Sequence, residues 1–410
     1  MLLYFFLLRI AALFGHRKAR LLVQGQGATL ERLRKQPVGG QGRLLWFHAA
    51  SAGEFEQARP LIERLRADNK PVRIVITFFS PSGYEMRKDY PLADAVFYLP
   101  FATRRNARAF IELLKPDMAL FIKYEFWPAY LRELKKRGIP AYSISSVFRA
   151  GQPFFRFYGR PYLNVLRNFS RLYVQDEESR SLLEKKGISQ VTVAGDTRFD
   201  RMAAVARQAQ SVPQAEEFVH GDIYRLPAGD TPVIVAGSTW PEDEQLLARY
   251  MEERDDVKLI LVPHEVTEER LKTIFRLFKG RYVRFTRATR NNIVQSRVLV
   301  VDCTGKLSAL YRYATAAYVG GGFGAGIHNT VEAAVYGVPV VFGPRYTAFR
   351  EAVDMVRSGA AMSVRNYREF ARAMDCAVSE HAMRGKTAAE YVRAETGATG
   401  KIYNELFDNI

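Results

Sequence analysis

The chain has 410 residues, of which 48% are hydrophobic and 25% charged, as in an ordinary globular protein. Because single cores stop growing at roughly 250–300 residues, two domains are expected. The net charge of +17 indicates an anionic partner, either acidic lipid, phosphorylated sugar or nucleic acid. No zinc-finger spacing or aromatic RNP-type strand accompanies the basic residues, so we expect no nucleic-acid partner.

Residues 1–14 form an apolar segment that only Arg9 interrupts, and a basic stretch follows at 16–20. A spanning helix needs about 20 apolar residues, and a signal peptide carries its positive charge before the apolar stretch. Residues 1–20 are therefore expected to form an anchor helix in the membrane interface, with its basic flank on anionic head groups. A helix docked on the protein's own core is the alternative.

From Arg43 onward, strand-like runs alternate with helix-period segments, which is typical of parallel βαβ units. The first series of runs covers residues 44–49, 72–79, 95–99, 118–125, 141–147, 172–175 and 191–194. The second series covers 233–236, 257–262, 282–285, 298–301, 316–319 and 338–342. We expect an α/β protein with two doubly wound, Rossmann-like domains, at 21–215 and 216–387, which face each other across a cleft. A C-terminal helix at 388–410 would cross back to the first domain.

Two acidic residues follow strands of the first domain, where ligands of such sheets bind. Ser51 and Glu54 have the spacing of a capping box, in which the glutamate satisfies a free backbone N–H. Alternatively, Glu54 projects into the cleft, where it could take a proton from a hydroxyl group. Glu125 comes directly after an apolar run, a position that core packing explains poorly. Either carboxylate is a candidate general base.

The glycine-rich stretch at 318–332, YVGGGFGAGIHNTVE, follows a strand of the second domain. Glycines allow close approach of the backbone, and a helix starting near His328 would offer free N–H groups to a phosphate. Glu332, one turn further on, could then reach the hydroxyls of a ribose. Together with the GVPVV strand at 337–341, this order of residues indicates a nucleotide-sugar site.

The stretch also resembles retaining glycosyltransferases of the two-domain type, which carry a second glutamate where this chain has Gly324. That departure favours an inverting single displacement, which needs a general base on the acceptor side. No Asp-x-Asp pattern suited to a metal-bound diphosphate follows a predicted strand. The two cysteines, Cys303 and Cys376, suggest neither a disulfide framework nor a thiolate metal site. The sequence therefore predicts a site without metal or cofactor.

Six segments together resemble the Kdo transferase family, whose members act on 3-deoxy-D-manno-octulosonic acid. They are WFHAASAGE at 46–54, SPSG at 80–83, EFWP at 125–128, GDTRFD at 195–200, AGST at 236–239 and the block from HNTVE at 328–332 to FGP at 342–344. The resemblance implies a GT-B fold, CMP-Kdo as donor and a lipid A precursor (lipid IVA) as acceptor. It also implies location at the cytoplasmic side of the inner membrane, where the anionic surface would be a partner.

By this resemblance Glu54 is the general base, while Glu125 and Arg198 stabilise the transition state. The implied CMP-Kdo contacts are Gly237, Ser238, Pro263, His264, Thr304, Gly305, Lys306, His328, Asn329, Thr330, Val331 and Glu332. The chain departs from the family pattern at His264, Lys306, Arg198, Arg345 and Ala348, and Trp240 is also atypical. Lys306 reverses a charge beside the expected nucleotide, which makes donor contacts there less secure than the catalytic assignment.

Two other functions fit the residues. A UDP-sugar-using GT-B transferase or epimerase would share the glycine-rich block in outline. A non-catalytic, membrane-peripheral protein that binds nucleotide or lipid would need no general base.

Overall fold

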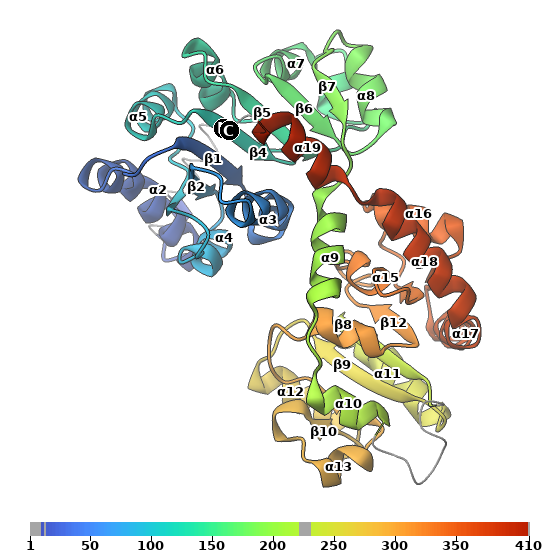
Figure 1. Ribbon diagram of the computed structural model, residues 1–410. Coiled ribbons are helices and arrows are strands. Elements are labelled where there is room, and N and C mark those ends of the chain that lie inside the picture. Colours follow the sequence, from blue (N-terminus) through green and yellow to red (C-terminus); the bar gives the residue numbers. More distant parts are fainter. Residues whose placement is uncertain (1–9, 12–13, 221–230, 409–410) are drawn as a thin grey trace. The chain divides into compact units, whose positions relative to one another are not determined.

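The computed structural model describes residues 10–11, 14–220 and 231–408. The chain divides into two compact units, Met1–Arg201 with Glu395–Ile410, and Met202–Ala394 (Figure 1). Most of the predicted anchor segment lies outside the described residues. Within the described ranges, no helix has the length and apolar character that crossing a membrane requires.

The first unit is built on a seven-stranded parallel sheet with the order β3-β2-β1-β4-β5-β6-β7. Each run predicted as a strand in this part of the chain forms one. The strands are β1 (Arg43–Ala49), β2 (Val72–Phe78), β3 (Ala95–Tyr98), β4 (Met118–Ile122), β5 (Ala141–Ser146), β6 (Arg171–Val174) and β7 (Val191–Val193). The helices are α2 (Arg17–Lys35), α3 (Ala52–Ala67), α4 (Pro81–Arg87), α5 (Arg104–Leu114), α6 (Pro128–Lys136), α7 (Arg160–Leu166), α8 (Glu177–Glu184) and α19 (Ala398–Phe407), with a 3₁₀ turn η1 (Pro153–Phe155).

Hydrophobic cores cover both faces of this sheet, because successive side chains of a strand point to opposite faces. In β1, Trp46 belongs to one core, where its ring lies 5.1 Å from Phe110 and 5.2 Å from Phe121. Its neighbour Phe47 belongs to the other core, together with Phe55 of α3. Both faces of β1 are thus buried, so its polar chemistry is confined to its carboxyl end.

The second unit repeats the plan with a parallel sheet in the order β10-β11-β9-β8-β12-β13-β14. Its strands are β8 (Val233–Thr239), β9 (Lys258–Pro263), β10 (Val283–Arg284), β11 (Val298–Val300), β12 (Ala316–Val319), β13 (Val340–Phe342) and β14 (Ala361–Ser363). Its helices are α10 (Pro213–His220), α11 (Pro241–Glu253), α12 (Glu268–Leu277), α13 (Arg290–Val294), α14 (Leu307–Leu310), α15 (Val331–Ala334), α16 (Arg350–Ser358), α17 (Tyr367–Ser379) and α18 (His381–Glu395), with 3₁₀ turns η2 (Phe285–Arg287) and η3 (Tyr311–Tyr313). The edge strand β14 was not predicted, because three residues of mixed polarity give no strand signal.

The division between the units lies within a helix rather than in the proline-containing segment near residue 215. Helix α9 (Thr197–Gln208) carries no proline or glycine and continues past Arg201, where the first unit ends. At the other end of the chain, α18 continues to Glu395 and the return to the first unit begins there, instead of at 388. Asp200 fixes the returning segment by accepting hydrogen bonds from the backbone N–H groups of Gly397 at 2.6 Å and Thr399 at 2.7 Å.

Candidate functional site

The two candidate general bases lie at the same edge of the first sheet. Strands β1 and β4 are hydrogen-bonded neighbours, with His48 level with Phe121. Glu54 stands in the first turn of α3, which follows β1, and Glu125 stands shortly after β4. The structure thus brings together two carboxylates that are separated by 70 residues in the sequence. Their proximity is also electrostatic, since the charge of Glu125 raises the pKa of Glu54.

Glu54 forms the capping box that its spacing predicted. One oxygen, Oε2, accepts the N–H groups of Ala50 at 2.9 Å and Ser51 at 3.2 Å, while the N–H of Glu54 donates to Ser51 Oγ at 3.4 Å. The other oxygen, Oε1, has no hydrogen bond within the described part of the chain. One carboxylate oxygen therefore holds the helix start while the other remains available, and the two interpretations of Glu54 are compatible.

The half-buried Glu54 carboxyl group has a raised pKa. Burial is the largest cause, followed by the charge of Glu125, whereas Lys123, at the end of β4, acts in the opposite direction. A carboxylate with a raised pKa accepts a proton more readily than one in water, which is the property that a general base at neutral pH needs. The environment of Glu54 thus suits proton transfer.

Glu125 is 9% exposed, and its Oε2 atom accepts two side-chain hydrogen bonds. The indole N–H of Trp127 donates at 2.6 Å, and His48 Nε2 lies at 2.9 Å. Both donors come from residues that the sequence places in the EFWP and WFHAASAGE segments. They fix the orientation of the Glu125 carboxylate, while its Oε1 has no hydrogen bond among the described residues.

His48 is fully buried and belongs to a chain of hydrogen bonds across β1 and β2. The indole N–H of Trp46 donates to Thr77 Oγ1 at 2.8 Å, and Thr77 Oγ1 lies 2.8 Å from His48 Nδ1. If the Thr77 hydroxyl donates to Nδ1, a neutral His48 carries its proton on Nε2 and donates it to Glu125. Each side-chain donor in this series of hydrogen bonds then has an acceptor, and Glu125 accepts as a carboxylate. Sequence reasoning assigned His48 no role, although the histidine lies in the quoted motif.

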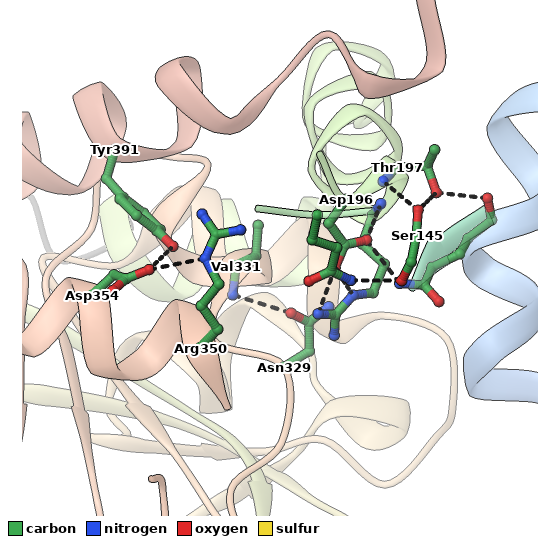
Figure 2. A network of polar contacts seen from close by, with 11 residues as sticks. Ser145, Asp196, Thr197, Asn329, Val331, Arg350, Asp354 and Tyr391 are labelled. Atoms are coloured by element: carbon green, nitrogen blue, oxygen red, sulfur yellow. Dashed lines mark hydrogen bonds and ion pairs between the residues drawn. The ribbon is translucent and has the colours of Figure 1, made fainter. Parts of the chain in front are cut away.

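Arg198 is held by the carboxylate of Asp196, a buried residue at the start of α9. Arg198 Nε donates to Asp196 Oδ2 at 2.8 Å, and the amide groups of Gln57 and Gln175 donate to the same carboxylate at 2.9 Å and 3.0 Å. Burial would raise the pKa of Asp196, but Arg198 and the hydrogen bonds outweigh it and the pKa is lowered. Figure 2 shows Asp196 beside Ser145 and Thr197, whose hydroxyl donates to the backbone of Gln57 at 2.7 Å. This network connects the start of α9, where Arg198 stands, to α3, the helix of Glu54.

In the second unit, the residues predicted to bind the donor gather at the carboxyl ends of four neighbouring strands, β11, β9, β8 and β12. After β11 come Thr304, Gly305 and Lys306, and the end of β9 carries Pro263, which His264 follows. The end of β8 carries Gly237 and Ser238, and after β12 come residues His328 to Glu332. This edge is where ligands of doubly wound sheets bind. Sequence reasoning therefore selected residues that share one surface, although it could not give their contacts.

Three rings form a stack at this edge. His264 stacks on Trp240 at 4.8 Å between ring centroids and on His328 at 4.4 Å. The indole N–H of Trp240 donates to His328 Nε2 at 3.1 Å, so the ring proton of a neutral His328 is on Nδ1. Burial, and secondarily His264, lower the pKa of His328 to about 4. His328 therefore offers a neutral N–H donor to a ligand, and the two atypical residues Trp240 and His264 are packing partners.

The glycine-rich loop packs too closely for side chains. A Cβ on Gly320 would lie 2.4 Å from the Ser238 carbonyl oxygen, and one on Gly322 would lie 2.6 Å from Gly343. Asp243 of α11 secures the loop, because its carboxylate accepts the N–H of Gly321 at 2.9 Å and the hydroxyl of Tyr318 at 2.6 Å. The glycines thus serve backbone packing as well as ligand access. Asp243 was missed by the sequence analysis, since an aspartate in a first helical turn usually caps it.

The helix expected near His328 begins at Val331 and has only four residues. Asn329 Oδ1 accepts the Val331 N–H at 3.1 Å, which occupies one of the backbone donors expected to face a phosphate (Figure 2). Glu332 accepts hydrogen bonds from Asn329 at 3.2 Å and from Ser308 at 3.0 Å. The helix dipole at this position is small because so few peptides are aligned. Side chains, rather than a helix end, must supply most of the polarity here.

Two further departures from the family pattern have clear positions. Lys306 is exposed and directly precedes α14, whose Ser308 binds Glu332. The guanidinium of Arg345 donates to the carbonyl of Gly324 at 2.5 Å and so closes the glycine-rich loop. In the described ranges, no three His, Cys, Asp or Glu side chains are grouped as a metal site would require. Metal independence stays a prediction.

The chain is similar in sequence to known Kdo transferases. Residues 27–201 match the family model of 3-deoxy-D-manno-octulosonic-acid transferase (Kdo transferase). The 3-deoxy-D-manno-octulosonic acid transferase of Rickettsia prowazekii is 27% identical over 80% of this chain and 70% of its own length. The corresponding enzyme of Chlamydia trachomatis is 28% identical over 76% of this chain and 72% of its own length.

Solved structures with low identity show the fold. UDP-GlcNAc 2-epimerase from Neisseria meningitidis has a TM-score of 0.63 at 15% identity and covers 90% of this chain and all of its own. MurG from Acinetobacter baumannii has a TM-score of 0.55 at 12% identity, with coverage of 89% and 99%. These likenesses and the two parallel sheets confirm the predicted GT-B fold class. The family model over residues 27–201 and the transferase relatives show that this chain resembles the 3-deoxy-D-manno-octulosonic acid (Kdo) transferase family.

Proposed function

We propose that this glycosyltransferase moves Kdo from CMP-Kdo to a hydroxyl group of a lipid A precursor, lipid IVA, with inversion and with Glu54 as general base. The observation that carries the proposal is the state of the Glu54 carboxyl group. One oxygen is used in the cap of α3, the other has no hydrogen bond within the described residues, and the pKa is raised. A carboxylate with only a capping role would need neither an oxygen left without a hydrogen bond nor a raised pKa.

In the proposed reaction, the hydroxyl oxygen of the acceptor attacks the anomeric carbon of Kdo while its proton passes to Glu54. The bond between that carbon and the phosphate oxygen breaks, and CMP leaves with the bonding electron pair. A monophosphate leaving group needs less charge neutralisation than a diphosphate, and fixed N–H donors can supply part of it. Glu125 would stabilise positive charge developing on the sugar, and Arg198, oriented by Asp196, would stabilise negative charge.

The second unit would hold the CMP moiety. His328 is kept neutral by its surroundings, and its Nδ1–H is the donor suited to a phosphate oxygen. Glu332, held by Ser308 and Asn329, presents a carboxylate of the kind that binds ribose hydroxyls. The stacked rings of Trp240 and His264 provide the aromatic surface that would replace the arginine usual in the family.

The lipid acceptor accounts for the net charge of +17 and for the apolar segment at residues 1–14. A phosphorylated lipid in an anionic leaflet favours a basic protein surface. The enzyme would act at the cytoplasmic side of the inner membrane, with residues 1–20 as an interface anchor.

The decisive experiment incubates purified full-length protein with CMP-Kdo and lipid IVA and determines product mass. Growth of the lipid by one or more Kdo units, with release of CMP, is the expected result and also gives the number of transfers. Parallel reactions contain UDP-N-acetylglucosamine in place of CMP-Kdo. Turnover of the UDP-sugar without turnover of CMP-Kdo would replace the proposal with a UDP-sugar enzyme, and lipid binding without either turnover would indicate a non-catalytic protein.

A further inference from the structure

The segment after β5 exposes aromatic and basic side chains together. Phe157 is 98% exposed, Tyr158 51% and Tyr162 49%. Arg156 and Arg160 are also exposed and lie beside these rings in the sequence. Large exposed aromatic side chains in a cluster are costly in water unless the surface contacts a partner. We call residues 153–162 the aromatic loop.

The sequence stretch that contains the aromatic loop carries charge of one sign. Between Glu133 and Asp176 the sequence has no acidic residue, whereas it has eight basic ones: Lys135, Lys136, Arg137, Arg149, Arg156, Arg160, Arg167 and Arg171. Two of the eight form ion pairs with acids elsewhere in the unit, Arg137 with Glu112 and Glu133, and Arg171 with Glu405. Neither Arg156 nor Arg160 has an ion pair within the described chain. An anionic partner would complement this surface.

The aromatic loop is held in place by its own apolar residues. Phe154 packs on Phe126 and on Phe148, each at 5.6 Å between ring centroids, and also contacts Tyr162 at 5.9 Å. A turn closes the tip, where the Gly159 N–H donates to the Arg156 carbonyl at 2.9 Å. The inward rings therefore fix the base of the loop while Phe157 and Tyr158 remain in solvent.

The base of the aromatic loop also contacts the candidate active site of the first unit. Phe126, which Phe154 contacts, directly follows Glu125 in the chain, and the loop follows β5, the neighbour of β4. Since the carboxyl ends of parallel strands meet at one edge of a sheet, the loop and the two carboxylates belong to the same edge. A lipid surface on this loop would lie beside the residues that act on a lipid acceptor.

We propose that the aromatic loop is a membrane-contact surface, separate from residues 1–20, which inserts Phe157 and Tyr158 into the headgroup region of an anionic bilayer. Aromatic rings prefer the boundary between acyl chains and water, and nearby arginines gain from anionic head groups. The purpose of this contact rests on the proposed lipid acceptor. The contact itself can be measured without turnover.

The test measures binding of full-length protein to vesicles by flotation. Vesicles contain phosphatidylethanolamine with phosphatidylglycerol, or phosphatidylcholine alone. The variant Phe157→Ser/Tyr158→Ser should bind both kinds at least about tenfold more weakly, since even partial burial of two aromatic rings supplies such a factor. The variant Arg156→Gln/Arg160→Gln should lose affinity only for the anionic vesicles and show a weaker dependence on salt.

Two exposed methionines give matched controls. Met86→Ser in the first unit and Met383→Ser in the second replace side chains that are 65% and 61% exposed, and both should bind vesicles as the unchanged protein does. Circular dichroism checks that every variant is folded. Loop variants that bind anionic vesicles normally would overturn the inference.

Transfer to detergent-dispersed lipid IVA separates this inference from the proposed function. The loop variants should keep near-normal turnover there, because no bilayer is present. A large loss in detergent would assign the loop to the acceptor itself and contradict the membrane contact. If unchanged protein transfers no Kdo but the loop variants still lose vesicle binding, the proposed function fails and the membrane contact stands.

Discussion

Glu125 is hydrogen-bonded to the buried ring of His48, with 2.9 Å between Nε2 and Oε2. His48 lies near the end of β1 and Glu125 lies shortly after the neighbouring parallel strand β4, and His48 is itself fixed by Thr77 on its other nitrogen. A neutral His48 with its proton on Nε2 satisfies the series of hydrogen bonds from Trp46 to Glu125. We therefore expect His48 to be a positioning residue, which acts through Glu125 and not on the substrate.

Replacing His48 tests this role. His48→Leu removes the donor to Glu125, and we expect kcat to fall about tenfold with little change in the KM for CMP-Kdo, since removing a hydrogen bond to a charged group costs about 1.5–3 kcal/mol. His48→Gln can still donate and should recover part of kcat. Thermal unfolding of both variants is measured alongside. If His48→Gln loses as much kcat and as much thermal stability as His48→Leu, the role of His48 is purely structural.

The contacts of His48 show where sequence reasoning stops. The motif placed a histidine at the end of a strand, but its partner Glu125, shortly after β4, lies 77 residues away, and no local pattern specifies that pairing. The strands themselves were predictable, because buried parallel strands are continuous apolar runs. The sequence predicted the edge of each sheet to which a residue belongs and the local capping box of Glu54, but not the hydrogen-bond partners that come from other strands.

In the second unit, too, the sequence did not predict the contact between Trp240 and His264. The sequence marked both as departures from the family pattern, and the structure shows that they stack on each other. The expected helix at His328 was placed too early because Ile327 to Thr330 follow glycines without a clear cap, and Val331 is the first helical residue. Short helices are governed by tertiary packing, so their starts are poorly encoded locally.

His328 should make the stability of the protein depend on pH. Its pKa is about 4 in the folded state and about 6.5 in an unfolded chain. Between these values the unfolded state binds more protons, so the free energy of unfolding falls as the pH falls from 6.5 toward 4. Urea unfolding at pH 7 and pH 5 should show a smaller difference for His328→Gln than for the unchanged protein. An identical difference would mean that His328 titrates normally.

Activity should not require a divalent ion. The described residues hold no cluster of three metal-ligating side chains, and the proposed leaving group is a monophosphate. Excess EDTA should leave the initial rate of Kdo transfer nearly unchanged. A severe loss that magnesium or manganese restores would contradict this and favour a UDP-sugar enzyme.

Deletion of residues 1–14 tests the sequence-based anchor. We expect the shortened protein to bind membranes more weakly and to turn over membrane-bound acceptor more slowly, because each buried Leu or Phe contributes roughly 1.5–3 kcal/mol. Folding should be retained, as judged by thermal unfolding. Unchanged sedimentation with membranes, or precipitation of the shortened chain, would assign the segment to the protein core.

The sharpest prediction concerns Glu54, which serves both as helix cap and as proposed base. Glu54→Gln keeps an oxygen that can accept the N–H groups of Ala50 and Ser51, but it cannot take a proton. We expect kcat to fall by about 10²–10⁴, the usual contribution of a positioned general base. Because burial raises the pKa of Glu54, its charge costs stability at neutral pH, so the glutamine variant should unfold at the same temperature or higher.

Ser51→Ala provides the control, since it removes the other half of the capping box. It should cost about 1 kcal/mol of stability and little rate. The pH profile gives a further check. A base must be deprotonated, so kcat/KM should decline as the pH falls through the raised pKa of Glu54, above the ordinary carboxyl value of 4.5. If Glu54→Gln keeps near-normal turnover, Glu54 is only a cap, and Glu125 becomes the candidate base.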